Sequence, residues 1–328
     1  MTWDSLQYAV EGISGGASTI IVDDRDLPSI MNVFSKRTNA QLFGGSNKVH
    51  SAWIVDDIEK ENFYFSKYIN TIIDGRAYSL ANVIPAHSLD FESAMNCCTQ
   101  KGSGWHLASL AEWAAIVHLM HKAGYNARGN NNHGANYTFS TEHGNSDSDG
   151  LTSTGSGPVA WNHDGSLGGI SDFVGNVGKW LSGMRIIDGE INVMTGNTPA
   201  AHASHQINSD SWRAIMPDGT FVAPKTDGVY YYTSYGTIST THVDGIISDG
   251  FATVSGDNLP EIMNELLLCP VEGINYSGII EATLDGERMP IRGGSYLDRA
   301  NAGAAALFLN QSRSYKNTSV GFFSAYQV

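Results

Sequence analysis

The pattern of apolar and polar positions predicts two helices in the first half of the chain. Residues 90–102 are expected to form a helix with Asp90 as its N-cap, and Gly102 is expected to end it. Residues 110–124 give the clearest helical signal, because the run is rich in Ala and Leu and ends in Lys and Gly. Both helices are therefore bounded by residues that favour helix ends.

Strand signals surround these helices. Residues 51–55 and 63–69 are rich in aromatic and β-branched side chains, and residues 185–260 return to short strands and turns. Residues 126–169 are rich in Asn, Gly, Ser, Asp and Thr with little periodicity, which is typical of a long, packed or functional loop. This order predicts a loop-rich α+β protein.

The first 45 residues differ from the rest. An amphipathic start is followed by a Gly15-Gly16 break and two apolar runs at residues 19–22 and 30–34, and residues 44–46 resemble a joint. We therefore expect residues 1–45 to be a small attachment or assembly segment. The remaining residues, 46–328, are expected to form one domain.

Composition narrows the class of partner. The chain has 328 residues and a net charge of −14, which argues against nucleic acid, because phosphates require a basic face. Its three cysteines are too few for a disulfide scaffold and are expected to be buried thiols. No secretory signal is visible, and no apolar run approaches the roughly 20 residues that span a membrane. We expect synthesis in the cytoplasm without classical export, and no membrane insertion.

The C-terminal segment interleaves two kinds of position. The small or apolar ones are expected to be framework: Gly293, Gly294, Ala300, Ala302, Gly303, Ala306, Leu307, Leu309, Gly321 and Phe322. Between them lie chemically unrelated side chains: Tyr296, Leu297, Asp298, Arg299, Phe308, Tyr315, Ser319 and Phe323. Aromatic residues with one acid and one cation are closer to a binding surface than to a catalytic site.

Four ordered motifs resemble a known family. They are Phe-Ser-Lys-Tyr at 65–68, the segment 104–113, Gly-Ile-Ser-Asp-Phe-Val-Gly-Asn-Val at 169–177, and Arg-Gly-Gly-Ser at 292–295. Together they resemble the formylglycine-generating-enzyme-like branch of the C-type lectin fold over about residues 50–328. The resemblance implies that fold for this chain.

Within that fold, the C-terminus is similar to the variable proteins of diversity-generating retroelements. Those elements rewrite Asn codons in a C-terminal coding segment, here expected at about residues 292–325. The resemblance implies that Lys316 and Gln311 are framework. It implies variable, ligand-binding positions at Tyr296, Leu297, Asp298, Arg299, Phe308, Tyr315, Ser319 and Phe323, with Ser295, Asn301, Asn310 and Asn317 as further candidates. Their side chains are expected to point outward from a rigid scaffold.

Enzymatic and metal-binding alternatives follow from the same resemblance. The enzyme branch uses a C-terminal cysteine pair, and no cysteine follows Cys269, so we expect no enzyme and no cofactor. Family calcium sites would use the Asp172 carboxylate and the carbonyls of Gly175 and Val177. Lys179 stands where a glutamate would complete that site, and an ammonium does not ligate a cation. Lys179 is instead expected to act as an internal cation paired with Asp172.

Other polar clusters leave alternatives open. The loops at 147–149 and 162–165 are suited to calcium binding or to turn formation by Asn, Asp and Gly. The histidine pairs are suited to metal binding or to structural roles. These pairs are His118 with His121 and His202 with His205.

The sequence thus predicts a diversified receptor-binding protein of a phage or prophage tail tip. Its target would be a bacterial cell-surface protein or glycan, and its location the virion. Residues 1–45 would contact tail structural proteins or drive homo-oligomerisation, and several copies would add avidity. The alternatives are a bacterial cell-associated variable binding protein and, on weaker grounds, a formylglycine-generating-type oxidase.

Overall fold

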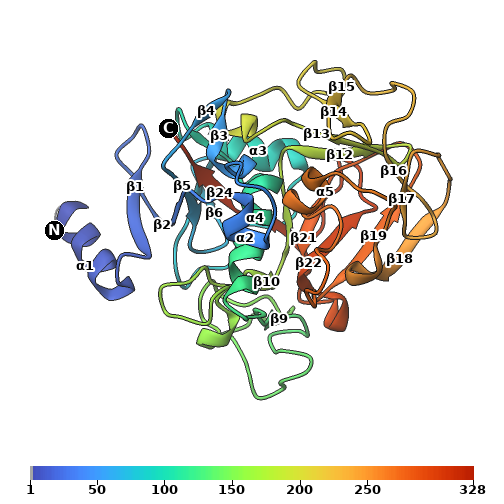
Figure 1. Ribbon diagram of the computed structural model, residues 1–328. Coiled ribbons are helices and arrows are strands. Elements are labelled where there is room, and N and C mark those ends of the chain that lie inside the picture. The colour runs from blue at the N-terminus through green and yellow to red at the C-terminus, as the bar shows by residue number, and fades with distance from the viewer. Residues whose placement is uncertain (1–2) are drawn as a thin grey trace.

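The computed structural model describes residues 3–328, so the first two residues of the predicted N-terminal segment lie outside the described part. Loops and short strands predominate over helices (Figure 1), and the chain is mixed α and β as predicted. No helix within residues 3–328 is both long and apolar enough to cross a membrane. The α-helices are α1 (Trp3–Ser14), α2 (Asn39–Phe43), α3 (Phe91–Thr99), α4 (Leu110–Lys122) and α5 (Glu261–Glu265).

Helix α4 is the central element of the core. Ser109 and Glu112 form a capping box at its start, which satisfies backbone N–H groups that the helix leaves unpaired. The Trp113 ring stacks on Phe173 with ring centroids 3.9 Å apart. The Trp113 indole also donates to the carbonyl of Ala304 at 2.8 Å. The predicted helix at 110–124 is therefore confirmed, and it ties distant segments together.

The other local predictions have mixed outcomes. The predicted start of the helix at residue 90 is confirmed, because the Asp90 side chain accepts the Ser93 N–H as an N-cap, but the helix ends at Thr99 rather than at Gly102. The strand predicted at 51–55 is largely wrong. Ser51–Trp53 forms a 3-10 turn, η1, and only Ile54–Val55, β3, is a strand. The reason is local: the His50 side chain accepts the Ala52 N–H, and the Ser51 N–H binds a glutamate instead of a neighbouring strand.

The N-terminal strands are part of the main body. A five-stranded antiparallel sheet has the order β1-β2-β5-β24-β8, so the last strand of the chain lies between two early ones (Figure 1). Residue 45 therefore does not separate two sheets, whereas helix α1 has no buried residue. The strands are β1 (Ser18–Val22), β2 (Pro28–Ser35), β5 (Asn62–Ser66), β8 (Trp105–Leu107) and β24 (Ser324–Tyr326).

A six-stranded sheet carries most of the C-terminal segment. Its order is β18-β19-β22-β21-β11-β23, with parallel pairs β19–β22 and β11–β23. Segments far apart in sequence thus share one surface. The strands are β11 (Gly178–Trp180), β18 (Ile246–Gly250), β19 (Ile279–Thr283), β21 (Ile291–Gly293), β22 (Gly303–Leu309) and β23 (Val320–Phe322).

The short strands expected at 185–260 mostly form a third sheet. It has seven strands, including β20 (Glu287–Arg288). The others are β12 (Met184–Ile187), β13 (Glu190–Val193), β14 (Arg213–Ile215), β15 (Phe221–Val222), β16 (Tyr231–Tyr232) and β17 (Ile238–Ser239). Two-stranded pairs complete the fold: β3 with β4 (Ile58–Glu59), β6 (Thr71–Ile73) with β7 (Arg76–Tyr78), and β9 (Gly129–Asn130) with β10 (Val174–Gly175).

Candidate functional site

A shallow pocket of about 200 Å³ opens on the six-stranded sheet. Strands β11, β19, β21, β22 and β23 contribute to it, together with the turns that follow β21 and β22. Several predicted variable residues line it, although separate parts of the segment supply them. The lining residues are Gly178, Glu281, Ile291, Gly294, Ser295, Asp298, Phe308, Asn310, Gln311, Tyr315, Ser319 and Val320.

One wall of the pocket pairs an aromatic ring with a carboxylate. Phe308 on β22 is half-buried and is in register with Glu281 on the parallel strand β19. Asn310 donates its side-chain N–H to Glu281 Oε1 at 2.5 Å, and its own Oδ1 has no partner. The sequence prediction missed Glu281, which precedes the C-terminal segment. Only the β19–β22 pairing brings it to the pocket.

A second carboxylate comes from the turn after β21. Asp298 Oδ2 accepts the backbone N–H of Ser295 at 2.6 Å, which holds the turn closed. Burial raises the pKa of the Asp298 carboxyl above its usual range. None of the described residues that line the pocket is basic. The pocket thus offers hydrogen-bond acceptors and aromatic rings.

The loop between β22 and β23 is fixed by ion pairs beneath it. The Arg313 guanidinium binds both carboxylate oxygens of Glu287, at 2.6 and 2.8 Å, in bidentate geometry. Lys316 lies 3.0 Å from the Asp90 carboxylate. Asn317 is exposed and accepts the Ser319 N–H through its side chain at 3.0 Å. These contacts position Tyr315 and Ser319 at the pocket.

Beside the pocket, the long loop at 126–169 meets the C-terminal segment. Leu297 is 44% exposed, and Arg299 is also exposed. The Arg299 guanidinium lies 6.0 Å from the ring of Tyr137, which is itself 49% exposed. Asn131 donates its side-chain N–H to the Arg299 carbonyl at 2.7 Å. The long loop therefore supports this exposed ridge and adds an aromatic ring to it.

The expected outward orientation is wrong for two of the predicted variable residues. Phe323 is fully buried between β23 and β24, and its ring lies 5.1 Å from that of Phe65. Tyr296 is 5% exposed, and its ring lies 5.6 Å from that of His133, under the long loop. Ser295 is also buried, although it lines the pocket. Phe323 therefore belongs to the core.

Two glycines that the sequence analysis assigned to the framework set the turn at the start of the segment. Gly293 and Gly294 have φ of 84° and 73°, in the left-handed region that disfavours other residues. A Cβ on Gly293 would lie 2.9 Å from the Phe173 carbonyl oxygen. A Cβ on Gly294 would lie 2.7 Å from that of Ala302. Close approach and backbone angle together require glycine at both positions.

An internal cation lies under this turn. The buried Lys179 ammonium donates to the carbonyls of Gly175, at 2.6 Å, and Phe173, at 3.1 Å. Burial lowers the pKa of Lys179 to about 7. Since the ammonium binds the Gly175 carbonyl that a family calcium ion would use, these residues do not fit calcium.

The predicted pairing of Lys179 with Asp172 needs correction. No contact within 4 Å joins their charged groups in the described structure. Asp172 Oδ2 accepts the Gly155 N–H at 2.8 Å, and its Oδ1 is buried without a partner. Burial raises the pKa of the Asp172 carboxyl to about 6, and the Lys179 charge opposes that rise. Lys179 and Asp172 therefore interact electrostatically at longer range, without a direct ion pair.

The neighbouring Gly-Asn-Val motif links the long loop to the site. Asn176 is buried, and its carbonyl accepts the Tyr296 N–H at 2.9 Å. Its side chain donates to the Thr152 carbonyl at 2.9 Å, and its own N–H donates to the Asn130 carbonyl at 2.6 Å. One residue thus joins the turn after β21 to two points of the loop.

Several of the remaining sequence candidates have structural partners, although the buried His121 Nε2 has no hydrogen-bond partner. Asp147 Oδ1 accepts the backbone N–H groups of residues 149, 150 and 151, as in a turn. The ring of His118 contacts the Asn264 carbonyl at 3.0 Å, and that of His205 accepts the Gly183 N–H at 3.1 Å. Across residues 3–328, no group of three or more His, Cys, Asp or Glu side chains is placed to hold a metal ion. All three cysteines are free thiols; Cys98 and Cys269 are buried as predicted, whereas Cys97 is only partly buried.

The fold and site define a loop-rich α and β protein with an acceptor-rich, aromatic pocket on its C-terminal segment. No protein family and no curated protein matches the sequence. The chain is similar to Treponema denticola variable protein 1, with a TM-score of 0.34 and 10% identity over 95% of this chain and 99% of that one. It is also similar to a Major Tropism Determinant I1 variant, with a TM-score of 0.34 and 12% identity over 94% of this chain and 71% of that one. A third similar structure is PvdO from Pseudomonas aeruginosa, with a TM-score of 0.32 and 14% identity over 94% of this chain and 98% of that one. Likeness at this level establishes neither family nor function.

The burial of Phe323 leads to a stability prediction. Replacing Phe323 with Ala should lower the free energy of unfolding by about 3–5 kcal/mol, because it leaves a cavity in the core. The matched change Leu297→Ala removes an exposed side chain and should alter it by less than about 0.5 kcal/mol. Urea unfolding followed by circular dichroism measures both. Similar values for the two variants would contradict the placement of these side chains.

The raised pKa of Asp172 leads to a pH prediction. Between its unfolded pKa near 3.8 and its folded pKa near 6, the folded state retains a proton that the unfolded state has lost. Stability from this group therefore falls as pH rises through that window. The Asp172→Asn variant has no such carboxyl group. Its free energy of unfolding relative to that of the wild type should therefore rise by about 2–3 kcal/mol from pH 4 to pH 6. Paired urea unfolding curves test this, and a pH-independent difference would refute it.

Proposed function

We propose that this chain is a sequence-diversified binding protein with a C-type lectin fold, whose C-terminal segment recognises its target. One observation carries the proposal: chemically unrelated residues from separate stretches of the segment meet at a single pocket. Asp298, Phe308, Tyr315 and Ser319 line it, while the small residues between them pack the sheet. Such a division allows surface chemistry to change while the core is preserved.

The pocket chemistry favours binding over catalysis. Half-buried Phe308 and Tyr315 supply contact area that costs little conformational entropy on binding. The exposed ridge with Leu297 and Arg299 extends the surface beyond the pocket. No cysteine lines the pocket, and Cys269 is buried, where its pKa is raised to about 12. These features support our proposal of a binding protein rather than an enzyme of the formylglycine-generating type.

The proposed target is a protein or glycan on a bacterial surface, and the proposed setting is a phage tail tip. Helix α1 supports an attachment role, because none of its residues is buried while Trp3, Tyr8 and Ile13 are exposed. Attachment of several copies to one particle would convert weak contacts into avidity. A bacterial cell-associated variable binding protein would use the same face, and the location of the protein distinguishes the two.

Diversification can be tested by deep sequencing of codons 293–328 in a growing population of the source. We expect substitutions at Leu297, Arg299, Phe308, Tyr315 and Ser319, because these side chains are exposed or only partly buried. The codon for buried Phe323 should stay apolar. Variation spread evenly over framework glycines, or a uniform sequence without a nearby template copy, would refute diversification.

Binding can be tested with labelled protein and a panel of intact bacterial strains by flow cytometry. The double variant Phe308→Ala, Tyr315→Ala should weaken binding to any recognised strain at least about tenfold, because aromatic anchors dominate such contacts. Replacement of Tyr235, which is exposed and does not line the pocket, serves as the control. Unchanged binding by a double variant that melts like the wild type would contradict the assignment of the face.

A further inference from the structure

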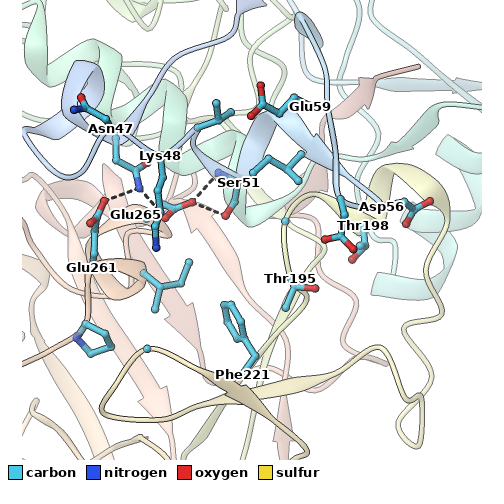
Figure 2. A pocket seen from close by; sticks show the side chains of 18 of the residues that line it. Asn47, Lys48, Ser51, Asp56, Glu59, Thr195, Thr198, Phe221, Glu261 and Glu265 are labelled. Carbon is cyan, nitrogen blue, oxygen red and sulfur yellow. Dashed lines mark hydrogen bonds between the residues drawn. The ribbon is translucent and has the colours of Figure 1, made fainter.

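A second and larger hollow lies elsewhere on the molecule. This cleft has a volume of about 970 Å³ and shares no lining residue with the pocket on the six-stranded sheet. Helix α2, the β3–β4 hairpin, residues 195–198, the β14–β15 turn and helix α5 surround it. Figure 2 shows Lys48, Glu261 and Glu265 on one side of the cleft and Asp56 on the other. None of the predicted variable positions lies here, so its chemistry is constant if that prediction holds.

The cleft is strongly acidic. Lys48 is the one basic side chain among the described residues that line it. Carboxylates come from both ends of the cleft and from several elements. The acidic lining residues are Asp56, Asp57, Glu59, Asp218, Glu261 and Glu265.

The rim carboxylates are presented by tight turns. Asp56 and Asp57 form the turn of the β3–β4 hairpin, with φ of 50° and 61°. Asp218 stands at the β14–β15 turn, where its Oδ1 accepts the Thr220 N–H at 2.9 Å. All three are exposed, and none of them has an ion-pair partner within 4 Å in the described residues. Their charges are therefore available to a ligand.

The wall of the cleft contains a buried acceptor without a donor. Asn39 lines the cleft and is 1% exposed; its side-chain N–H groups bind Glu261 at 2.7 Å and Glu265 at 2.9 Å. Its Oδ1 accepts no hydrogen bond. Glu265 is only 8% exposed, accepts from Ser51, and has no cationic partner within 4 Å in residues 3–328. Buried acceptors of this kind normally have partners, so a donor is missing here.

Apolar side chains separate the acidic groups. Half-buried Val49, Ile54, Phe221, Pro260 and Ile262 line the cleft between the carboxylates. Lys and Arg side chains combine a methylene stem with a charged donor, so they match such an alternation. A single metal ion would leave these apolar surfaces uncovered.

We propose that this acidic cleft is a docking site for an extended, Lys- and Arg-rich segment of a partner protein. The carboxylates at the rim attract the segment, the apolar walls cover the side-chain stems, and the unpartnered acceptor in the wall receives a donor. The cleft shares no lining residue with the pocket, so a test of this docking site does not depend on whether the pocket is a diversified binding face.

The test measures fluorescence anisotropy of a labelled hexa-arginine peptide with the full chain. Hexa-citrulline, which has nearly the same shape without charge, is the matched control peptide. We expect hexa-arginine to bind and hexa-citrulline not to bind. The affinity for hexa-arginine should fall at least tenfold between about 50 mM and about 300 mM salt. Asp56→Asn, Asp57→Asn, Asp218→Asn together should weaken it at least about tenfold, since Asn tolerates the same turns.

The control triple variant is Asp74→Asn, Asp188→Asn, Asp285→Asn. It removes the same number of negative charges from exposed positions outside the cleft, and two of these positions, Asp74 and Asp188, also have positive φ. The control variant should change the affinity for hexa-arginine less than about threefold. Lys48→Glu removes the one cation of the cleft and should tighten binding about threefold, which misfolding would not produce.

Several results would overturn the docking site. They are absence of hexa-arginine binding, equal binding of hexa-citrulline, or equal weakening by both triple variants, which would indicate only the overall negative charge. Displacement of the peptide by micromolar magnesium or spermine would point to a small-cation site instead. Unchanged or weaker binding by Lys48→Glu would also count against it.

Discussion

The need to bind a buried ammonium governs the architecture around the candidate site. Lys179 is fully buried, and a buried cation is costly unless its donors are satisfied. Two carbonyls bind it, which fixes the chain at residues 173–175. The Phe173 ring stacks on Trp113 of the central helix. The Phe173 carbonyl lies so close to Gly293 that it excludes any side chain there. The loop, the helix and the start of the C-terminal segment are thus held by one interaction.

This constraint gives the C-terminal segment a rigid base. Asn176, next to the bound carbonyls, holds both the long loop and the Tyr296 backbone. Arg313 and Lys316 secure the later loop through ion pairs with Glu287 and Asp90. Between these anchors, Leu297 and Arg299 reach the surface, whereas Leu307 and Leu309 of β22 pack the core. A rigid base with replaceable side chains is the physical requirement for a surface that changes its ligand.

The protein has two hollows that differ in origin. The small pocket combines predicted variable residues with Glu281 from a neighbouring strand, whereas the acidic cleft uses residues from the N-terminal, central and α5 regions. Both offer more acceptors than donors, consistent with the net charge of −14. The two proposals together describe a molecule that contacts a variable target through one hollow and a fixed partner through the other.

The sequence by itself determined features whose causes are local. The N-cap Asp90 begins a helix through its own side chain, and Gly293 with Gly294 marks a left-handed turn. Only the tertiary structure decided the features that depend on distant pairing. The first strands join a sheet with the last one, Glu281 reaches the pocket through β22, and Phe323 turns inward. Local spacing carries no information on which distant segment pairs with a strand, and that pairing decides which side chains are buried.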